Sequence, residues 1–183
     1  MKRDLRVVKT KQNLKIALLE LLKEKPLEDI TVTELCRNSK ITRRTFYLHY
    51  NNVPHYFEEF IDHLLLELED AITKTTQDRI ENKDQLEPKM INLFEHVYEN
   101  KEIYSFIFSS SSKFSYYEMF LNKIKLLVKY SMKSRNLQQE KIDFKVSFYA
   151  NAILGLVLEW YYEGFQTSTD DMNQALIREL TNN

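Results

Sequence analysis

The sequence predicts an all-α protein, on the evidence of its composition and of its apolar spacing. Among its 183 residues there are 2 Gly and 3 Pro, too few for turn-rich β architectures or for glycine-rich phosphate loops. Hydrophobic residues make up 43% of the chain and aromatic residues 13%, which supplies enough apolar surface for a sizeable core. Apolar residues also recur at intervals of three and four, as one buried helical face requires.

The first predicted helix covers residues 10–25. Leu14, Leu18 and Leu21 recur along it at helical spacing and give it one apolar face. Pro26 follows directly and ends the helix, because proline cannot continue the backbone hydrogen-bonding pattern.

Two short helices are expected next, each opening on a threonine. Thr31 and Glu34 form a capping box, in which each side chain accepts a hydrogen bond from the backbone amide of the other residue. Residues 38–40 break the pattern, and Thr42 caps a third helix over residues 42–50.

A long fourth helix and a helical remainder are predicted after residue 52. Asn52 caps the fourth helix, and Pro54 lies in its first turn. A polar stretch, residues 73–85, is either a fraying helix end or a linker. Further helices are expected over residues 86–99, 101–110, 114–134, 141–163 and 169–181, with Ser112 and Thr169 as caps for two of them.

Charge is distributed unevenly along the chain. Residues 1–52 hold twelve Lys and Arg against six Asp and Glu, a net charge of +6, and the remainder, with 14 against 21, carries −7. A basic N-terminal segment followed by an acidic remainder suits a protein that binds a polyanion through one end of the molecule. Charge alone does not separate DNA from RNA or anionic lipid.

Several function classes are not expected. The single Cys36 excludes an intrachain disulfide and fits a reducing cytosol. No apolar run reaches the roughly 18 residues of a membrane span, and no signal peptide is recognisable, so a cytoplasmic protein is expected. His55, Glu59 and His63 share a helical face but lack a further ligand, so no metal is expected. No catalytic pairing or cofactor fingerprint is present, and we expect neither an enzyme nor a cofactor.

The two short helices around residue 40 have the pattern of a helix-turn-helix. In that geometry the second helix lies in the major groove of DNA, and the N-terminus of the first points at a phosphate, where Thr31 stands. The alternative is an ordinary helical hairpin, which the basic surroundings make less favourable.

The segment Ile30–Cys36 and the run Ile41–Tyr50, with its Thr-Phe-Tyr-x-His-aromatic pattern, resemble the DNA-binding signature of the TetR/AcrR family. The resemblance covers roughly residues 10–60 and implies a three-helix DNA-binding domain, residues 1–52, followed by a helical ligand-binding and dimerisation domain, residues 53–183. It also implies that Phe46 is buried against the first helix, together with Leu35 and Ile41. The expected DNA-binding residues are Thr31, Thr33, Thr42, Arg43, Arg44, Thr45, Tyr47, His49 and Tyr50.

Two positions depart from the family pattern. Lys40 stands in the turn where the family usually has Gly, and a left-handed lysine there would cost on the order of 1 kcal/mol. Val53 replaces a common lysine that reaches a phosphate at the start of the fourth helix. That contact is either lost or supplied by His55 or the basic N-terminal arm. Cys36 falls where a small alanine is usual, so we expect it to be buried.

The helix predicted over residues 141–163 is apolar on most of its circumference and must be covered from two sides. One cover is its own domain, and the other is expected to be a second subunit, with Gly155 at the crossing point. A fully buried helix in a monomer is the alternative. The expected dimer interface comprises Ala150, Leu154, Gly155, Leu158, Tyr162, Met172, Leu176 and Leu180.

The C-terminal half, through Val97–Asn100 and Ile153–Tyr161, resembles a TetR subgroup related to dihydroxyacetone-kinase regulators. Its aromatic residues either pack a core or line a pocket for an apolar or aromatic effector. The pocket would contain Tyr98, Phe106, Phe108, Tyr117, Phe120 and Trp160.

The expected function is therefore that of a dimeric transcriptional regulator that binds double-stranded operator DNA. Repression is the family default, with relief by a small-molecule effector or a protein co-regulator and with no membrane partner. The alternative is a protein-binding adaptor on the same fold with weak or no operator binding.

Overall fold

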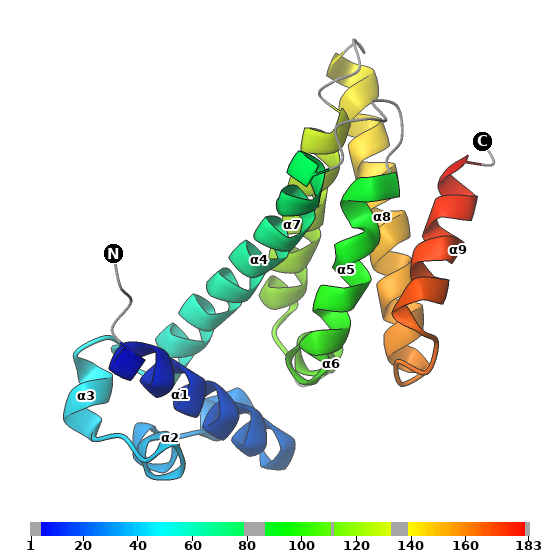
Figure 1. Cartoon of the computed structure of the whole chain (residues 1–183). Coiled ribbons are helices and arrows are strands. Elements are labelled where there is room, and N and C mark those ends of the chain that lie inside the picture. Colours follow the sequence, from blue (N-terminus) through cyan, green and yellow to red (C-terminus); the bar gives the residue numbers. More distant parts are fainter. Residues whose placement is uncertain (1–4, 79–86, 111, 133–138, 182–183) are drawn as a thin grey trace. The chain divides into compact units, whose positions relative to one another are not determined.

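A computed structural model of the chain describes residues 5–78, 87–110, 112–132 and 139–181. Within these ranges the chain forms α-helices and one 3₁₀ turn and has no strand, which confirms the all-α prediction (Figure 1). None of the described helices combines the length and the hydropathy that a membrane-spanning helix requires. The elements are α1 (Leu5–Glu24), η1 (Leu27–Asp29), α2 (Val32–Ser39), α3 (Arg43–Tyr47), α4 (Val53–Asp78), α5 (Glu87–Glu99), α6 (Lys101–Phe108), α7 (Phe114–Met132), α8 (Gln139–Tyr162) and α9 (Thr169–Thr181).

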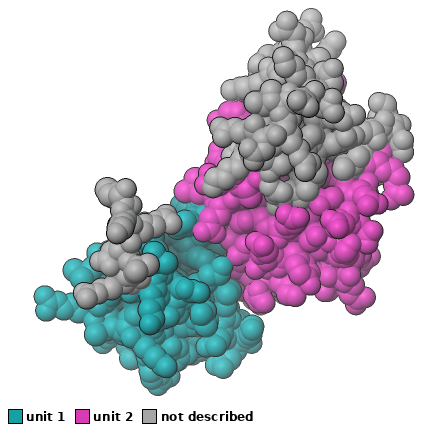
Figure 2. All heavy atoms as spheres, viewed as in Figure 1, with its two compact units in different colours: residues 1–63 teal, residues 64–183 magenta. Residues whose placement is uncertain are grey.

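The chain divides into two compact units, and the division falls inside α4 (Figure 2). Unit 1 comprises residues 1–63 and unit 2 comprises residues 64–183. The domain boundary predicted from the sequence lies earlier, between residues 52 and 53, at the start of this helix. Its first turns group with unit 1 because Tyr56 and Phe57 are buried there, with the Tyr56 ring centroid 6.2 Å from that of Phe46 in α3.

α1 begins at Leu5, five residues before the predicted start at Thr10. The intervening residues contain neither Gly nor Pro, so nothing in the sequence stops the helix there. Its predicted apolar face is confirmed, since Leu14 and Leu18 are buried in unit 1. The helix ends before Pro26, as expected.

The predicted caps of α2, α3 and α4 are confirmed. Thr31 Oγ1 accepts a hydrogen bond from the Glu34 amide at 3.2 Å, and Glu34 Oε2 accepts one from the Thr31 amide at 3.1 Å. Thr42 Oγ1 accepts from the Thr45 amide at 3.1 Å. Asn52 Oδ1 accepts from the amide of His55 at 2.8 Å. Each bond satisfies an amide that the helix itself leaves unpaired.

α3 is shorter than predicted and ends at Tyr47 instead of Tyr50. The carbonyl of Phe46 accepts hydrogen bonds from two amides beyond the helix, those of His49 at 3.0 Å and Tyr50 at 2.9 Å. The chain therefore leaves α3 through a tight turn that leads directly to the cap of α4.

The turn between α2 and α3 has the conformation expected from the sequence. Lys40 lies in the left-handed region, with φ 56° and ψ 37°. Its amide donates to the carbonyl of Arg37 at 3.3 Å. A side chain with a Cβ atom is strained in this conformation, because the Cβ approaches its own carbonyl oxygen.

An ion pair joins the C-terminal end of α1 to the first turn of α2. Lys25 Nζ lies 2.6 Å from Glu34 Oε1. The hydrogen bond from Lys25, with those from the amide and hydroxyl of Thr31, lowers the pKa of Glu34 from 4.5 to about 2. Glu34 thus completes a helix cap and an interhelical contact with the same carboxylate.

Unit 2 is built on the packing of α7 along α8 and of α5 against α9. The bounds of its helices lie within two residues of the predicted ones. The core contains large aromatic residues, among them Phe94, Tyr104, Phe120 and Trp160, none more than 1% exposed.

The connection from α8 to α9 is a Schellman-type turn followed by a cap. The amide of Phe165 donates to the carbonyl of Trp160 at 2.8 Å, and Gly164 has a φ of 70°. The predicted cap of α9, Thr169, is wrong by one residue. Ser168 Oγ accepts from the Asp171 amide at 3.1 Å, and Thr169 is the first residue of the helix.

Replacing Lys40 by glycine is expected to stabilise unit 1. Glycine adopts a left-handed conformation without steric cost, so Lys40→Gly should raise the free energy of unfolding by roughly 0.5–1 kcal/mol. Urea denaturation followed by circular dichroism measures this change. Lys40→Ala is the matched control, because it removes the same charge and keeps the Cβ. Equal stabilisation by both variants would assign the effect to charge and not to the backbone.

Replacing Glu34 by glutamine is expected to destabilise the chain in a pH-dependent way. Because the folded-state pKa of Glu34, about 2, lies below its ordinary 4.5, the carboxylate stabilises the fold above pH 4.5. That contribution is lost as the pH falls towards 2. The thermal midpoint of Glu34→Gln should lie below that of wild type at neutral pH, and the gap should close in acid. Glu24→Gln, an exposed acid at the end of α1, is the control. A gap that stays constant down to the acid limit would contradict this account.

Candidate nucleic-acid interface

Most of the predicted DNA-binding residues are accessible on unit 1. Thr45 is half-buried and Tyr50 is buried, at 7% exposed. The remaining seven are exposed: Thr31, Thr33, Thr42, Arg43, Arg44, Tyr47 and His49. They lie at the N-terminus of α2, at the start and along the length of α3 and, for His49, in the turn that follows α3. The structure therefore places them on two consecutive helices and the turn after the second.

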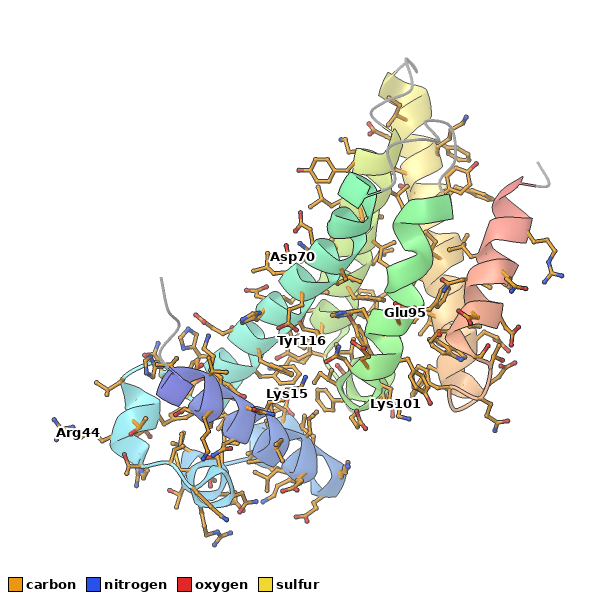
Figure 3. The ribbon with its side chains drawn as sticks, viewed as in Figure 1. Lys15, Arg44, Asp70, Glu95, Lys101 and Tyr116 are labelled. Carbon is orange, nitrogen blue, oxygen red and sulfur yellow. The ribbon has the colours of Figure 1, made fainter. Side chains whose placement is uncertain are left out.

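The outer face of α3 presents two guanidinium groups and a phenol. The Arg43 guanidinium lies 5.8 Å from the centroid of the Tyr47 ring, within the range of a cation–π contact. Tyr47 is 50% exposed. Arg44 extends from α3 away from α1 into solvent (Figure 3). Planar forks of this kind suit guanine edges and phosphates.

Phe46 anchors α3 from the opposite side. It is fully buried, as predicted, and its ring centroid lies 5.4 Å from that of Tyr50 and 6.2 Å from that of Tyr56. Tyr50 and Tyr56 themselves meet edge to face at 4.8 Å. Burial raises the pKa of the Tyr50 hydroxyl. The Tyr50 ring therefore lies in the packing that holds α3 on α4, in contrast to the exposed Tyr47.

The N-terminus of α2 is partly occupied by its own cap. Besides the capping-box bonds, the Thr31 hydroxyl lies 2.8 Å from Glu34 Oε2 and donates to it. Thr33, in the first turn, is exposed and makes none of these contacts. A phosphate at this end would meet Thr33 and the first-turn amides, which a helix leaves unpaired.

The residues behind α2 and α3 follow the predictions closely. Leu35 and Cys36 are buried, at 0% and 4% exposed, whereas Ile41, also predicted to be buried, is half-buried. Burial raises the pKa of the Cys36 thiol, which disfavours the reactive thiolate. Cys36 thus packs as a small apolar residue.

The start of α4 has no lysine available for DNA. Val53, which stands at that position, is 2% exposed. The neighbouring His55 is engaged locally: its Nδ1 accepts from the Asn51 amide at 3.2 Å, and its Nε2 lies 3.8 Å from Glu59 Oε1. His55 is therefore poorly placed to take over a phosphate contact.

The predicted effector residues form a partly continuous line of rings in unit 2. Phe120 meets Phe108 at 5.6 Å and Phe108 meets Tyr161 at 5.8 Å. Phe165 continues the line from Tyr161 to Trp160, on which Tyr98 stacks at 5.9 Å. Outside this line, Tyr117 stacks on the exposed Phe114, and Phe106 is buried.

Tyr104 is not among the effector residues predicted from the sequence. Its ring is fully buried and lies 5.0 Å from that of Phe120. Its hydroxyl has no hydrogen-bond partner among the described residues. Burial, and secondarily the charge of Glu67, raises the pKa of this hydroxyl. Nothing in the sequence separates Tyr104 from the other aromatic residues around it.

The predicted interface residues of α8 and α9 fall into two groups. Within the single chain Ala150, Leu154, Met172 and Leu176 are buried and Leu158 is half-buried. Gly155 and Tyr162 are exposed, and the side chain of Leu180 lies outside the described part.

Two phenylalanines that the sequence analysis did not select lie on the exposed face of α8. Phe144 is 75% exposed and Phe148 57%. With Gly155 and Tyr162 they follow the spacing i, i+4, i+11 and i+18, which is one helical face. A Cβ added at Gly155 would meet no heavy atom of the described residues within 4 Å, the backbone of its own helix turn left aside.

Two sequence comparisons both match transcriptional regulators. A TetR family model described as "Transcriptional regulator C-terminal region" matches residues 84–182, more than half of the chain. An uncharacterized HTH-type transcriptional regulator of Bacillus subtilis (strain 168), YxbF, is 38% identical over 71 residues. That match spans 38% of this chain and 19% of YxbF.

Solved structures share the fold at low identity. The dihydroxyacetone kinase operon activator DhaS has a TM-score of 0.68 at 19% identity, and 93% of each chain is covered. A TetR/AcrR-type transcriptional regulator from Aquifex aeolicus VF5 has a TM-score of 0.65 at 17% identity, covering 93% of this chain and 97% of that one. The likeness to DhaS agrees with the resemblance noted for the C-terminal half. These findings, with the helix-turn-helix of unit 1, lead to one conclusion: the chain belongs to the TetR family of transcriptional regulators and is not an enzyme.

Proposed function

We propose that this regulator is a dimer that binds operator DNA through α3 of each subunit and acts as a repressor. Regulators of this family bind operator DNA and usually dimerise. The observation that carries the proposal is the exposed face of α3, on which Arg43, Arg44 and Tyr47 project from a helix anchored by the buried Phe46. Exposed cationic forks on a rigidly held helix suit a major groove.

A second copy of the chain is the proposed cover for the outer face of α8. Phe144, Phe148 and Tyr162 expose large apolar side chains along that face, which water would otherwise surround. Gly155, near the middle, leaves space for a close helix crossing. Gly in a helix interior costs about 1 kcal/mol relative to Ala, and close approach of a partner helix offsets that cost.

An apolar or aromatic effector is the proposed ligand of unit 2. The line of rings from Phe120 to Trp160 and the buried hydroxyl of Tyr104 support an apolar site with a polar group for orientation. The protein has a state that can bind DNA and a state that cannot. A ligand at this site changes the affinity for DNA only if it binds one of these two states more tightly than the other. DhaS is named an activator, so the sign of regulation is a separate measurement, made by transcription from the target promoter with and without this protein.

A protein-binding adaptor with weak operator affinity is the second candidate. The buried Val53 favours it, because the lysine common at this position is missing. Salt-dependent binding to the promoter region of its own or an adjacent operon separates the two functions.

Replacing Arg44 or Tyr47 by alanine is expected to abolish operator binding. Arg44 is exposed, and Tyr47 is half-exposed and touches the core only through an edge contact of its ring with Phe46 at 5.7 Å, so dimer mass and most of the helicity should be kept. A good bidentate base contact contributes about 1–3 kcal/mol of discrimination. Gel shifts with the intergenic DNA beside the gene measure the loss, and Lys113→Ala, in unit 2, is the control. If both α3 variants retard the DNA as wild type does, the proposed binding of DNA through α3 is wrong.

Replacing Gly155 by glutamine is expected to convert the dimer to monomer without unfolding it. Gly155 is exposed and an added Cβ meets no described neighbour beyond its own helix turn, so the single chain should accept glutamine, and the helix gains up to about 1 kcal/mol of intrinsic stability. In the dimer the same side chain would separate the two crossing helices. Analytical ultracentrifugation measures the subunit mass. Ser115→Gln, at an exposed position of α7, adds comparable bulk elsewhere. A dimer as tight as wild type would place the interface on another face.

A further inference from the structure

Unit 1 contains a groove of about 190 Å³ between α1 and the region around α3. This is several times the roughly 30 Å³ that one water occupies in the liquid. Its floor is apolar and consists of the buried Leu14, the buried Tyr50 and the half-buried Ile41. Val7, 44% exposed, stands at its mouth.

The rim of the groove is polar and comes from α1 and from the stretch around α3. Lys11 follows Val7 by one turn on α1 and is exposed. Thr45 and His49, one turn apart near α3, line the opposite side. Both were predicted to contact DNA, whereas Lys11 was not. The groove thus continues the proposed DNA-binding surface from α3 onto α1.

We propose that this groove binds one sugar–phosphate unit of the DNA backbone, with deoxyribose against the apolar floor and the phosphate beside Lys11. The inference rests on the proposed function and adds a binding site to it. An apolar floor under a cationic rim matches the backbone, where an uncharged sugar alternates with an anionic phosphate. The charge of +6 on residues 1–52 favours the same occupant.

The site also accounts for the position of Val53. A buried valine there cannot reach a phosphate, and His55 is held by Asn51 beside Glu59. Of the two replacements that the sequence left open, the basic N-terminal region is therefore the one that the geometry favours. Lys11 supplies the contact from α1 that α4 lacks.

The test is the salt dependence of binding to a random-sequence DNA duplex, measured by fluorescence anisotropy. A non-specific duplex suffices, because phosphate contacts do not depend on base sequence. The slope of log K against log salt should decrease in magnitude by about 0.9 for each Lys11–phosphate contact that Lys11→Gln removes. Lys23→Gln is the matched control, since Lys23 is exposed in the last turn of the same helix and does not line the groove.

A second variant tests the groove itself. Val7→Trp fills its mouth from an exposed position, so the fold should persist, as judged by circular dichroism, while duplex affinity falls several-fold. If both lysine variants show the same slope, the inference is wrong and the proposed function stands. If Val7→Trp binds like wild type, the sugar does not occupy the groove, and the inference is also wrong. If wild type does not bind duplex at low ionic strength, the proposed function fails together with the inference.

Discussion

The burial of Phe46 determines which side chains of α3 unit 1 exposes to a binding partner. α3 has five residues, far fewer than an isolated helix needs in water, so its position depends on packing. Complete burial of a phenylalanine contributes roughly 1.5–3 kcal/mol, and the rings of Tyr50 and Tyr56 surround this one. Once Phe46 points inward, the helical repeat turns Arg44 and Tyr47 outward. The burial of Phe46 and the exposure of Arg44 and Tyr47 therefore both follow from the same orientation of α3 about its axis.

Helix caps set where each short element begins. Thr31, Thr42 and Asn52 each accept an amide hydrogen bond at a helix start, and such a cap contributes about 1 kcal/mol. The Lys25–Glu34 pair adds a connection between α1 and α2. A left-handed Lys40 acts against these contributions. With several caps in a small unit, the strain at one turn residue is tolerated.

Much of this arrangement could be predicted from sequence because it depends on local rules. Capping by Thr31 and Thr42 requires only the residue types three positions apart, and the burial of Phe46 follows from its place in the signature. Tyr47 and Tyr50 are harder, since both are aromatic and three residues apart. Their different exposure, 50% and 7%, depends on where α4 packs.

The outer face of α8 shows where sequence pattern is insufficient. The helix is apolar around most of its circumference, so periodicity does not indicate which residues belong to its own core. Ala150 and Leu154 are buried in the single chain, whereas Phe144 and Phe148 are exposed. Only the positions of α7 and the other neighbouring helices distinguish these two sets.

Val53 illustrates how a binding surface changes without a change of fold. The side chain of Val53 at the start of α4 is buried, at 2% exposed, so the proposed DNA-binding surface has no cation at this position. Backbone phosphates repeat along DNA, and their contribution to affinity depends on the number of cations that meet them. In the proposed binding mode, Lys11 on α1 therefore compensates for the lysine missing from α4. This freedom does not extend to the base contact proposed for Arg44, because a contact to a base edge requires a fixed position relative to that base.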